Sequence, residues 1–208
     1  MLRQGQIMNY NFYATVSRMK YIERWALMRN TISENLSEHS LEVSMISHAL
    51  CIIGNVRYKK KLDADYAAIV GIYHDASEII TGDMPTPVKY YNRSINEAFK
   101  SIEDEANKKL LSQLPEDIRT EYEKYFVKPE EKAYEWRLVK AADKISALIK
   151  CMEEEKTGNK EFVVAKKSTE KSVKKLAEEL PEVDTFVNEC LQAFSKTLDE
   201  LSDVSGFL

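Results

Sequence analysis

Two histidines and two aspartates, spread over three segments of the chain, have the donor types of a metal site. They are His39, the adjacent pair His74 and Asp75, and Asp143. Imidazole nitrogens together with carboxylate oxygens suit borderline divalent cations such as Mn²⁺, Co²⁺, Fe²⁺ or Zn²⁺. Four protein ligands on a six-coordinate ion leave about two positions for water and substrate. The residue types therefore indicate a catalytic metal centre, provided that the fold brings the three segments together.

His39 is expected on the inward face of a helix that begins near Asn35. Asn35 and Glu38 have the spacing of a capping box, and Gly54 suits the end of this helix. Apolar residues follow His39 at i+4, i+7 and i+11, with two more beside them: Val43, Ile46 and Leu50, then Met45 and Ala49. This stripe places the imidazole in the first turn, facing the core.

A second helix is predicted over residues 64–80, with Asp63 as its N-cap. On that helix His74 and Glu78 are i, i+4, and Asp75 and Glu78 are i, i+3. All three side chains can then line one wall of a cavity.

Asp143 lies on a third predicted helix, over residues 130–156, among apolar side chains. A buried carboxylate is costly unless it is paired or bound to a metal. Each donor also has a structural alternative. His39 could bond neighbouring backbone, His74 could be a satisfied core histidine, and Asp143 could pair with Lys140 or Lys144.

The composition favours helices as the elements that position these residues. Only 6 glycines and 5 prolines occur in 208 residues, which makes turns scarce and a β-sandwich a poor fit. The expected class is an all-α bundle forming a single domain over residues 1–208, with a core of about 10–165. Further helices are predicted over residues 13–28, 96–113, 115–129, 161–180 and 183–201, the last two packing on the core as C-terminal helices.

Charge and cysteine usage limit the partners and the compartment. With 30 Lys and Arg against 34 Asp and Glu, the chain lacks the basic excess that a nucleic-acid polymer requires. No apolar run approaches the roughly 20 residues that span a bilayer, so no membrane partner is expected. The 3 cysteines, Cys51, Cys151 and Cys190, form no CxxC pair and indicate free thiols in a reducing compartment. These features predict a cytoplasmic protein.

The order of the four donors, H…HD…D, resembles the signature of the HD-domain phosphohydrolase superfamily. Flanking segments narrow the resemblance to the bacterial HD-domain 5′-deoxynucleotidases: Arg24–Arg29, Ser37–Ser40, Tyr73–Glu78, Thr81–Lys89, Val139–Asp143 and Asn159–Phe162. The similarity covers roughly residues 10–165. It implies an all-α HD-domain bundle with a mononuclear metal site between its helices.

The resemblance also implies an activity and roles for particular residues. The activity is metal-dependent hydrolysis of deoxyribonucleoside 5′-monophosphates to deoxynucleoside and phosphate, by a cytoplasmic homodimer. One divalent metal is implied, with Co²⁺ favoured and Mn²⁺, Fe²⁺, Zn²⁺ or Cu²⁺ as alternatives. The implied metal ligands are His39, His74, Asp75 and Asp143; the catalytic residues are Glu78 and Asp75; the substrate-binding residues are Arg24, Trp25, Asp75, Asp83, Met84, Pro85, Thr86 and Asp143.

General chemistry gives reasons for three of these roles. Arg24 offers a permanently charged, two-pronged donor for phosphate. Trp25 can lie against the sugar, so that a ribose 2′-hydroxyl would clash or lose its hydration. Glu78 can accept or relay a proton as water attacks the phosphorus.

Other functions on the same scaffold remain open at this point. HD proteins also resemble cyclic-nucleotide phosphodiesterases and deoxynucleoside triphosphate triphosphohydrolases, and a non-catalytic nucleotide-binding protein could keep the same core. A triphosphohydrolase would need more cations than Arg24 and the nearby lysines. His48, the third of 3 histidines, lies nine residues after His39, about 180° around the helix. With no imidazole left to bridge a second ion, one metal is expected.

Overall fold

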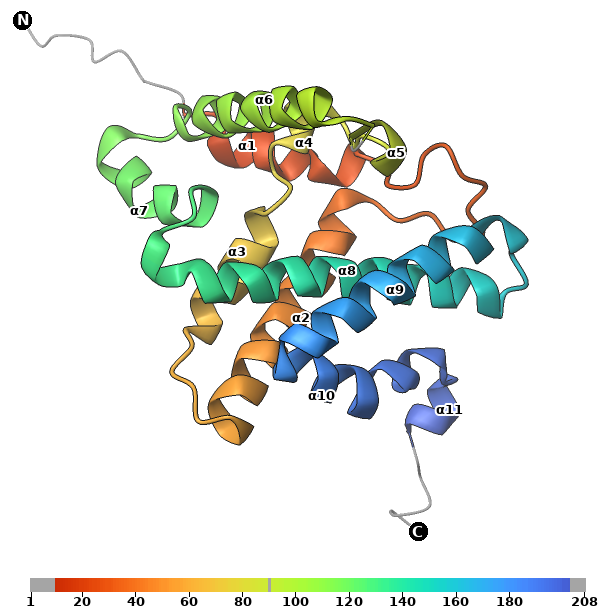
Figure 1. Cartoon of the computed structure of the whole chain (residues 1–208). Coiled ribbons are helices and arrows are strands. Elements are labelled where there is room, and N and C mark those ends of the chain that lie inside the picture. Colours follow the sequence, from red (N-terminus) through yellow and green to blue (C-terminus); the bar gives the residue numbers. More distant parts are fainter. Residues whose placement is uncertain (1–9, 90, 203–208) are drawn as a thin grey trace, which may run out of the picture.

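A computed structural model describes residues 10–89 and 91–202, apart from the side chains of residues 86 and 87. Helices and short 3-10 turns account for all the regular elements described, which confirms the predicted all-α class (Figure 1). The α-helices are α1 Phe12–Val16, α2 Leu36–Arg57, α3 Ala64–Tyr73, α4 Glu78–Thr81, α5 Thr86–Lys89, α6 Arg93–Leu111, α7 Glu116–Phe126, α8 Ala133–Lys156, α9 Val163–Glu179, α10 Pro181–Glu189 and α11 Leu198–Leu201. The 3-10 turns are η1 Ser17–Tyr21, η2 Glu130–Lys132, η3 Lys160–Phe162 and η4 Leu191–Ser195. Within the described residues, no helix is both long and apolar enough to cross a membrane.

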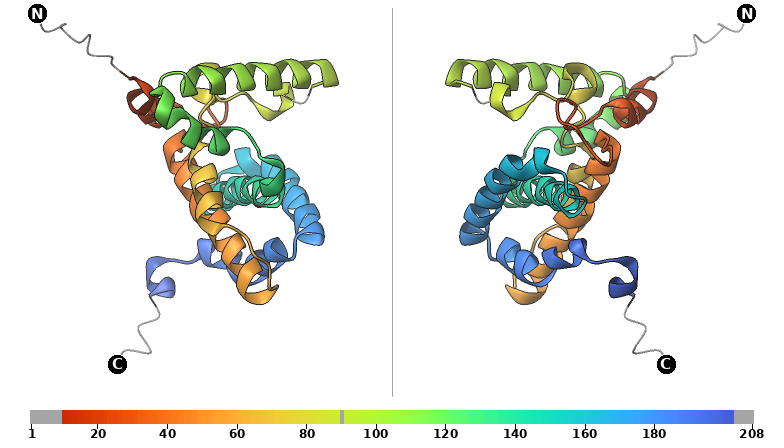
Figure 2. Two further views of the ribbon diagram at one scale, coloured as in Figure 1. Left: turned by 90° about the vertical axis from the view of Figure 1, so that its left-hand side faces the viewer. Right: turned by 90° about the vertical axis from the view of Figure 1, so that its right-hand side faces the viewer.

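Helix α8 lies at the centre of the bundle. Figure 2 views it nearly end-on, with α2 and α3 on one side and α9 on the other. The main apolar core joins these four helices and α10, around fully buried side chains such as Leu50, Val70 and Ile145. Each helix buries one apolar face in this core, and this burial supplies the stability that an isolated amphipathic helix lacks.

A second apolar cluster lies at one end of the bundle, beneath α1, α6 and α7 (Figure 1). Its members include Phe12, Leu36 and Ala76, all fully buried. Leu36 lies three residues before His39, and Ala76 follows Asp75 directly. The predicted metal ligands therefore lie where the two clusters meet.

The start of α2 agrees with prediction and its end does not. The Asn35 side chain accepts from the backbone of Ser37 and Glu38, and Glu38 completes the capping box. The helix continues past Gly54 to Arg57. A Cβ at Gly54 would lie 2.8 Å from Leu62 Cδ1 and 2.9 Å from Glu182 Oε1, so the glycine serves close packing there, not helix termination. The predicted position of Met45 beside the buried stripe is also wrong, because its side chain is exposed.

The second predicted helix is interrupted where the chemistry begins. Helix α3 ends at Tyr73, residues 74–77 form turns, and α4 begins at Glu78. Ala76 N donates to Tyr73 O at 2.9 Å and Glu78 N donates to Asp75 O at 2.9 Å, which are i→i−3 bonds of a tighter winding. The Gly71 carbonyl, which a continuing α-helix would bond to Asp75 N–H, accepts instead from the His74 ring. The expected i, i+4 relation of His74 and Glu78 on one continuous helix is therefore wrong.

The N-terminal helix is much shorter than predicted. Helicity stops at Tyr21, and the chain becomes extended at Ile22. Backbone hydrogen bonds then cross to the segment before α2: Leu36 N donates to Ile22 O and Arg24 N donates to Glu34 O, each at 2.9 Å. Trp25 follows with φ of 57°, in the left-handed region that a bulky side chain rarely adopts. These backbone bonds between distant residues take the place of helical bonds, and residues 25–34 form a loop.

The C-terminal predictions are also split by short turns. The predicted segment 161–180 begins as η3 and becomes α9 only at Val163, and the segment 183–201 consists of α10, η4 and α11. Pro181 occupies the first turn of α10, where its missing N–H has no helical partner to lose. Helix α8 likewise begins three residues after η2 starts at Glu130. The helices are therefore present as predicted, but less continuous.

Candidate metal centre and substrate loop

The four predicted ligands converge on one point from three parts of the chain. His39 comes from the first turn of α2, His74 and Asp75 from the turn after α3, and Asp143 from the middle of α8. One potential ligand atom of each lies within 4.8 Å of those of the others. His39 Nε2 lies 3.4 Å from Asp143 Oδ1 and 3.8 Å from Asp75 Oδ2, and His74 Nε2 lies 3.0 Å from Asp75 Oδ2.

A glycine permits this convergence. A Cβ at Gly71 would lie 2.7 Å from Ser44 Cα, so α2 and α3 approach more closely than any other residue would allow. Gly71 is one turn before His74, and Ser44 is little more than one turn after His39. The close crossing brings the two imidazole rings to 5.3 Å between centroids.

Hydrogen bonds at the far side of each ring determine which nitrogen has the lone pair. His74 Nδ1 lies 2.8 Å from Gly71 O, and because a carbonyl only accepts, Nδ1 has the hydrogen. His39 Nδ1 lies 2.9 Å from Ser146 Oγ, and Ser146 donates its own hydrogen to Glu42. The hydroxyl therefore accepts from His39 Nδ1–H. In both neutral rings the lone pair is on Nε2, facing the carboxylates.

This donor set fits a divalent cation. His39 Nε2 and His74 Nε2 are buried and have no hydrogen-bond partner among the described residues. Two lone pairs and two carboxylates pointing at one small volume repel each other unless a positive charge lies between them. The other ring nitrogens are bonded to oxygen acceptors, as in most protein sites where histidine binds metal. A divalent metal site is thus indicated, and it is the one cluster of this kind within the described residues.

The carboxylates are ionised in this environment. Burial alone would raise the pKa of Asp75, but without a cation the protonated form of His74 outweighs burial and lowers that pKa to about 2. A bound cation would take the place of that proton on Nε2. Asp143 also has its pKa held well below the usual range, because His39 and Lys144 outweigh burial. Asp143 Oδ2 does pair with Lys144 at 2.9 Å, as one structural alternative proposed, while Oδ1 faces His39.

Glu78 lies at the start of α4 with its side chain almost entirely buried. Burial, followed by the negative charges of Asp75 and Asp83, raises its pKa to about 9. Its Oε2 atom has no hydrogen-bond partner among the described residues. A carboxyl group in this state keeps its proton at neutral pH and can donate it.

Arg24 and Trp25 are held beside the centre by a residue that the sequence does not single out, Glu34. Arg24 Nη1 donates to Glu34 Oε1 and Trp25 Nε1 donates to Glu34 Oε2, each at 3.0 Å. Burial would lower the pKa of Arg24, but Glu34, Asp143 and Asp75 together raise it. The guanidinium thus lies in the field of the ligand carboxylates. The indole ring packs against Phe162, with 5.4 Å between centroids.

The segment after α4 is placed less tightly. Gly82 has φ of 73° and turns the chain into the loop, where Asp83 and Pro85 are exposed and Met84 is half-buried. The side chain of Thr86 lies outside the described part of the structure. The negative charge of Asp83 helps to raise the pKa of both Arg24 and Glu78, so this charge lies near the candidate metal centre.

Lys89 is a second cation near the site that the sequence reasoning did not assign. Its Nζ pairs with Glu103 at 2.8 Å. Burial would lower the pKa of Lys89, but Glu103 and Asp75 raise it. Ser146, Glu42 and Glu34 were also not anticipated, because a serine on α8 or a glutamate in a polar stretch has no local signal. His48 behaves as predicted: its side chain is 46% exposed and lies on the outer face of α2.

The fold, with the His/Asp cluster at its centre, is the one found in structures of HD-domain phosphohydrolases. The structure is similar to that of an HD-domain phosphohydrolase from Listeria innocua, with a TM-score of 0.78 at 20% identity over 94% of each chain. It is also similar to the cyanophage S-2L HD phosphohydrolase, whose structure holds dA and one catalytic Zn²⁺ ion. The TM-score there is 0.58 at 20% identity, over 88% of this chain and 96% of that one.

Sequence relatives then specify the family. The model of the YfbR-like 5′-deoxynucleotidases matches residues 11–194. A 5′-deoxynucleotidase of Vibrio vulnificus is 45% identical over 193 residues, which cover 92% of this chain and 98% of the relative. One from Erwinia tasmaniensis is 44% identical over 195 residues, covering 94% and 98%. The chain belongs to the YfbR-like 5′-deoxynucleotidase family and is an enzyme, a hydrolase, as the sequence motifs predicted.

Proposed function

We propose that this chain hydrolyses deoxyribonucleoside 5′-monophosphates to deoxynucleoside and phosphate at the centre formed by His39, His74, Asp75 and Asp143. The observation that carries the proposal is the convergence of these four donors, within 4.8 Å, beside a largely buried Arg24 and a buried Glu78. The family relationship supports the substrate class.

Each part of a phosphate monoester has a counterpart among these residues. His39, His74, Asp75 and Asp143 would hold a divalent cation, which would supply positive charge to the phosphoryl oxygens and make water a better nucleophile at neutral pH. Arg24 binds the phosphate with its guanidinium, and Lys89 adds a second positive charge nearby. The substrate dianion thereby enters a site where ionised Asp75 and Asp143 would otherwise repel it.

Glu78 supplies the proton that the leaving group requires. As water attacks the phosphorus, the bond from phosphorus to the 5′ oxygen breaks, and that oxygen needs a proton to leave as an alcohol. The Glu78 carboxyl donates this proton and regains one from the attacking water. Its buried position next to Asp75 and Asp83 favours the protonated form before the step.

Trp25, with Asp83, Met84, Pro85 and Thr86, is proposed to enclose the sugar and base. The indole is fixed by its bond to Glu34 and its packing on Phe162. A rigid ring against C2′ leaves no partner for a ribose hydroxyl, and an apolar contact of this kind discriminates by about 10²-fold.

Hydrolysis of matched dAMP, AMP, dATP and a cyclic nucleotide, followed both by phosphate release and by chromatography of the nucleoside and nucleotide products, tests the proposal. The purified chain loaded with Co²⁺ should release phosphate from dAMP faster than from AMP, and should release none directly from dATP or the cyclic nucleotide. D143N should lose both metal binding and turnover. Preferred cleavage of dATP or of the cyclic nucleotide would refute the proposal and assign the chain one of the alternative HD activities.

Co²⁺ is proposed as the metal that supports the highest activity. The two imidazoles and two carboxylates support a borderline cation, a class that includes Co²⁺, Mn²⁺, Fe²⁺ and Zn²⁺. Removing metal with a chelator and restoring each ion in turn should rank Co²⁺ first. A higher rate with another ion would replace this assignment.

We also propose that the chain is one HD domain that forms a cytoplasmic homodimer. The solvent face of α2 has an apolar stripe that a second copy can cover symmetrically: Leu41, Met45, Ile52 and Val56. Light scattering should give twice the 24.0 kDa chain mass for the parent protein, and the mass of a single chain for M45E. The three cysteines, all free, support a reducing compartment.

A further inference from the structure

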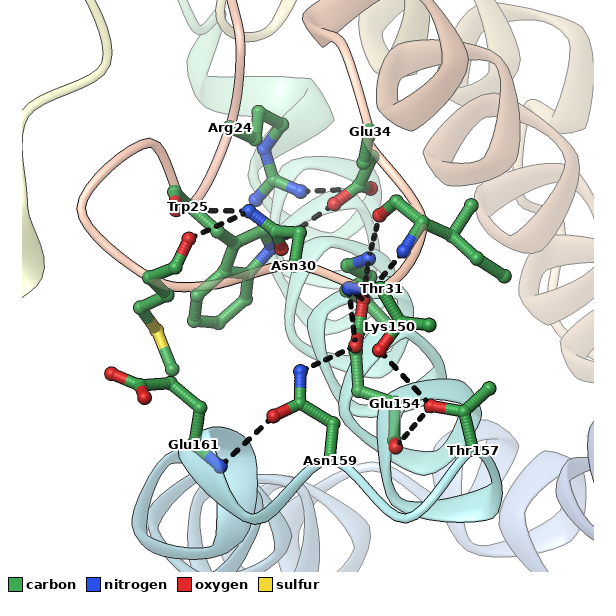
Figure 3. A network of polar contacts seen from close by, with 12 residues as sticks. Arg24, Trp25, Asn30, Thr31, Glu34, Lys150, Glu154, Thr157, Asn159 and Glu161 are labelled. Atoms are coloured by element: carbon green, nitrogen blue, oxygen red, sulfur yellow. Dashed lines mark hydrogen bonds and ion pairs between the residues drawn. The ribbon is translucent and has the colours of Figure 1, made fainter.

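A buried ion pair on α8 holds the loop that follows Trp25. Glu154 is 1% exposed and Lys150 is 4% exposed, one turn apart on the same face of the helix. The Glu154 carboxylate accepts from the backbone N–H of Thr31 at 2.9 Å and of Ile32 at 3.2 Å (Figure 3). Lys150 Nζ bonds both Glu154 and the carbonyl of Ile32. The ion pair thus binds the loop backbone at two N–H donors, those of Thr31 and Ile32, and at one acceptor, the carbonyl of Ile32.

Asn159 extends this contact along the loop. Its Nδ2 donates to Glu154 Oε2 and to Arg29 O, each at 2.7 Å. Inside the loop, Asn30 Nδ2 donates to Trp25 O at 3.2 Å and to Met28 O at 3.1 Å. Figure 3 shows two sets of polar contacts on this loop: Glu154, Lys150 and Asn159 hold Thr31 and Ile32, while Asn30 and Glu34 hold Trp25. The backbone from Asn30 to Thr31 joins the two sets.

The two ends of this loop hold the proposed substrate groups. Trp25 begins it with φ of 57°, a conformation that persists only where the surroundings enforce it. Glu34 ends it and binds both Arg24 and Trp25. Burying two charges is expensive, and well-packed apolar residues of similar volume often stabilise a fold as well or better. Stability alone therefore does not account for a charged pair at this position.

We propose that Glu154 and Lys150 are positioning residues for recognition of the deoxyribose. By anchoring Thr31 and Ile32, they keep the loop in the one geometry in which Glu34 can hold Arg24 against the phosphate and Trp25 against the sugar. The inference rests on the proposed function, because it assigns the loop to that substrate.

The K150M/E154Q double variant tests this role. It removes both charges and keeps an amide oxygen as an acceptor for the loop N–H groups. A displacement of about 1 Å in a substrate-positioning group costs roughly 10²-fold in rate. We expect kcat/KM for dAMP to fall about 10- to 100-fold and the dAMP/AMP ratio to fall toward one. The affinity for Co²⁺ should stay within about twofold of the parent. N159A, which removes only the outer bonds, should move the ratio in the same direction by less.

E182Q is the matched control. Glu182 is fully buried and pairs with Lys60, but it packs against Gly54, at the end of α2 remote from His39. It should lower the melting temperature without changing the dAMP/AMP ratio. If K150M/E154Q and N159A lower turnover of both nucleotides equally, or weaken Co²⁺ binding as much as turnover, the pair is merely structural and the proposal is overturned.

A substrate-free readout separates this inference from the proposed function. Trp25 and Trp136 are the 2 tryptophans of the chain, so in a W136F background the tryptophan fluorescence comes from Trp25. K150M/E154Q should increase the quenching of this fluorescence by acrylamide. Unchanged quenching would refute the positioning role. Failure of the parent enzyme to release phosphate from dAMP would refute the proposed function instead, whatever the quenching result.

Discussion

Ser146 should determine metal affinity although it is not a ligand. His39 Nδ1 donates to Ser146 Oγ at 2.9 Å, and Ser146 in turn donates to Glu42. In S146A the ring loses this acceptor, and the remaining oxygen near Nδ1, Glu34 Oε1, is 3.7 Å away. The hydrogen can then move to Nε2, where Asp143 Oδ1 at 3.4 Å is the nearest carboxylate atom. A cation must displace that hydrogen before it can bind.

Loss of such an outer hydrogen bond lowers metal affinity by about 10- to 100-fold, which corresponds to about 1.4 to 2.7 kcal/mol. The same range follows from leaving one buried donor without a partner, about 1–3 kcal/mol. Competition titration against a chromophoric chelator, with Zn²⁺ or Co²⁺, measures the change directly. E42Q should weaken binding less, because its amide oxygen can still accept from Ser146.

S47A is the control for removal of a buried hydroxyl. Ser47 is fully buried on α2, its Oγ has no hydrogen-bond partner among the described residues, and it lies eight residues from His39, about 12 Å along the helix. Its metal affinity should equal that of the parent. Binding by S146A within about twofold of the parent would refute the tautomer argument.

Three further predictions concern single residues. E78Q should lower kcat by about 10²- to 10⁴-fold with unchanged Co²⁺ affinity, because the amide cannot donate the proton in exchange; a residual rate above one tenth would contradict its role. W25A should reduce the dAMP/AMP ratio by up to about 10²-fold in the phosphate-release assay, and an unchanged ratio would remove Trp25 from sugar selection. Hydrogen bonds from Lys150, Asn159 and Thr31 outweigh burial and lower the pKa of Glu154 from 4.5 to about 2. The ionised Glu154 should therefore contribute about 3 kcal/mol to the free energy of unfolding above pH 4.5, and this contribution should be lost as the pH falls toward 2. Urea titrations between pH 2 and 6 should show this slope in the parent and a flatter one in E154Q.

The sequence predictions succeeded where the interactions are local and failed where they join distant parts of the chain. The capping box at Asn35 and the His39 stripe are local, since every partner lies within a few residues on the same helix. The break after Tyr73 was missed because the His74 side chain competes with the backbone for the Gly71 carbonyl, and propensity does not register this competition. The N-terminal helix was overextended because the bonds at Ile22 and Arg24 go to residues more than nine positions away.

The sequence by itself determined the all-α class, the four ligand types and the family, because each depends on residue identity and short spacing. Only the tertiary structure decided what orients those ligands and holds the substrate loop. Ser146 meets His39 across 107 positions and Glu154 meets Thr31 across 123. Such pairs arise where α8 crosses α2 and the loop before it, and no local pattern of charge or hydrophobicity encodes that crossing. A buried serine and a buried glutamate acquire their roles only from the groups that the fold places opposite them.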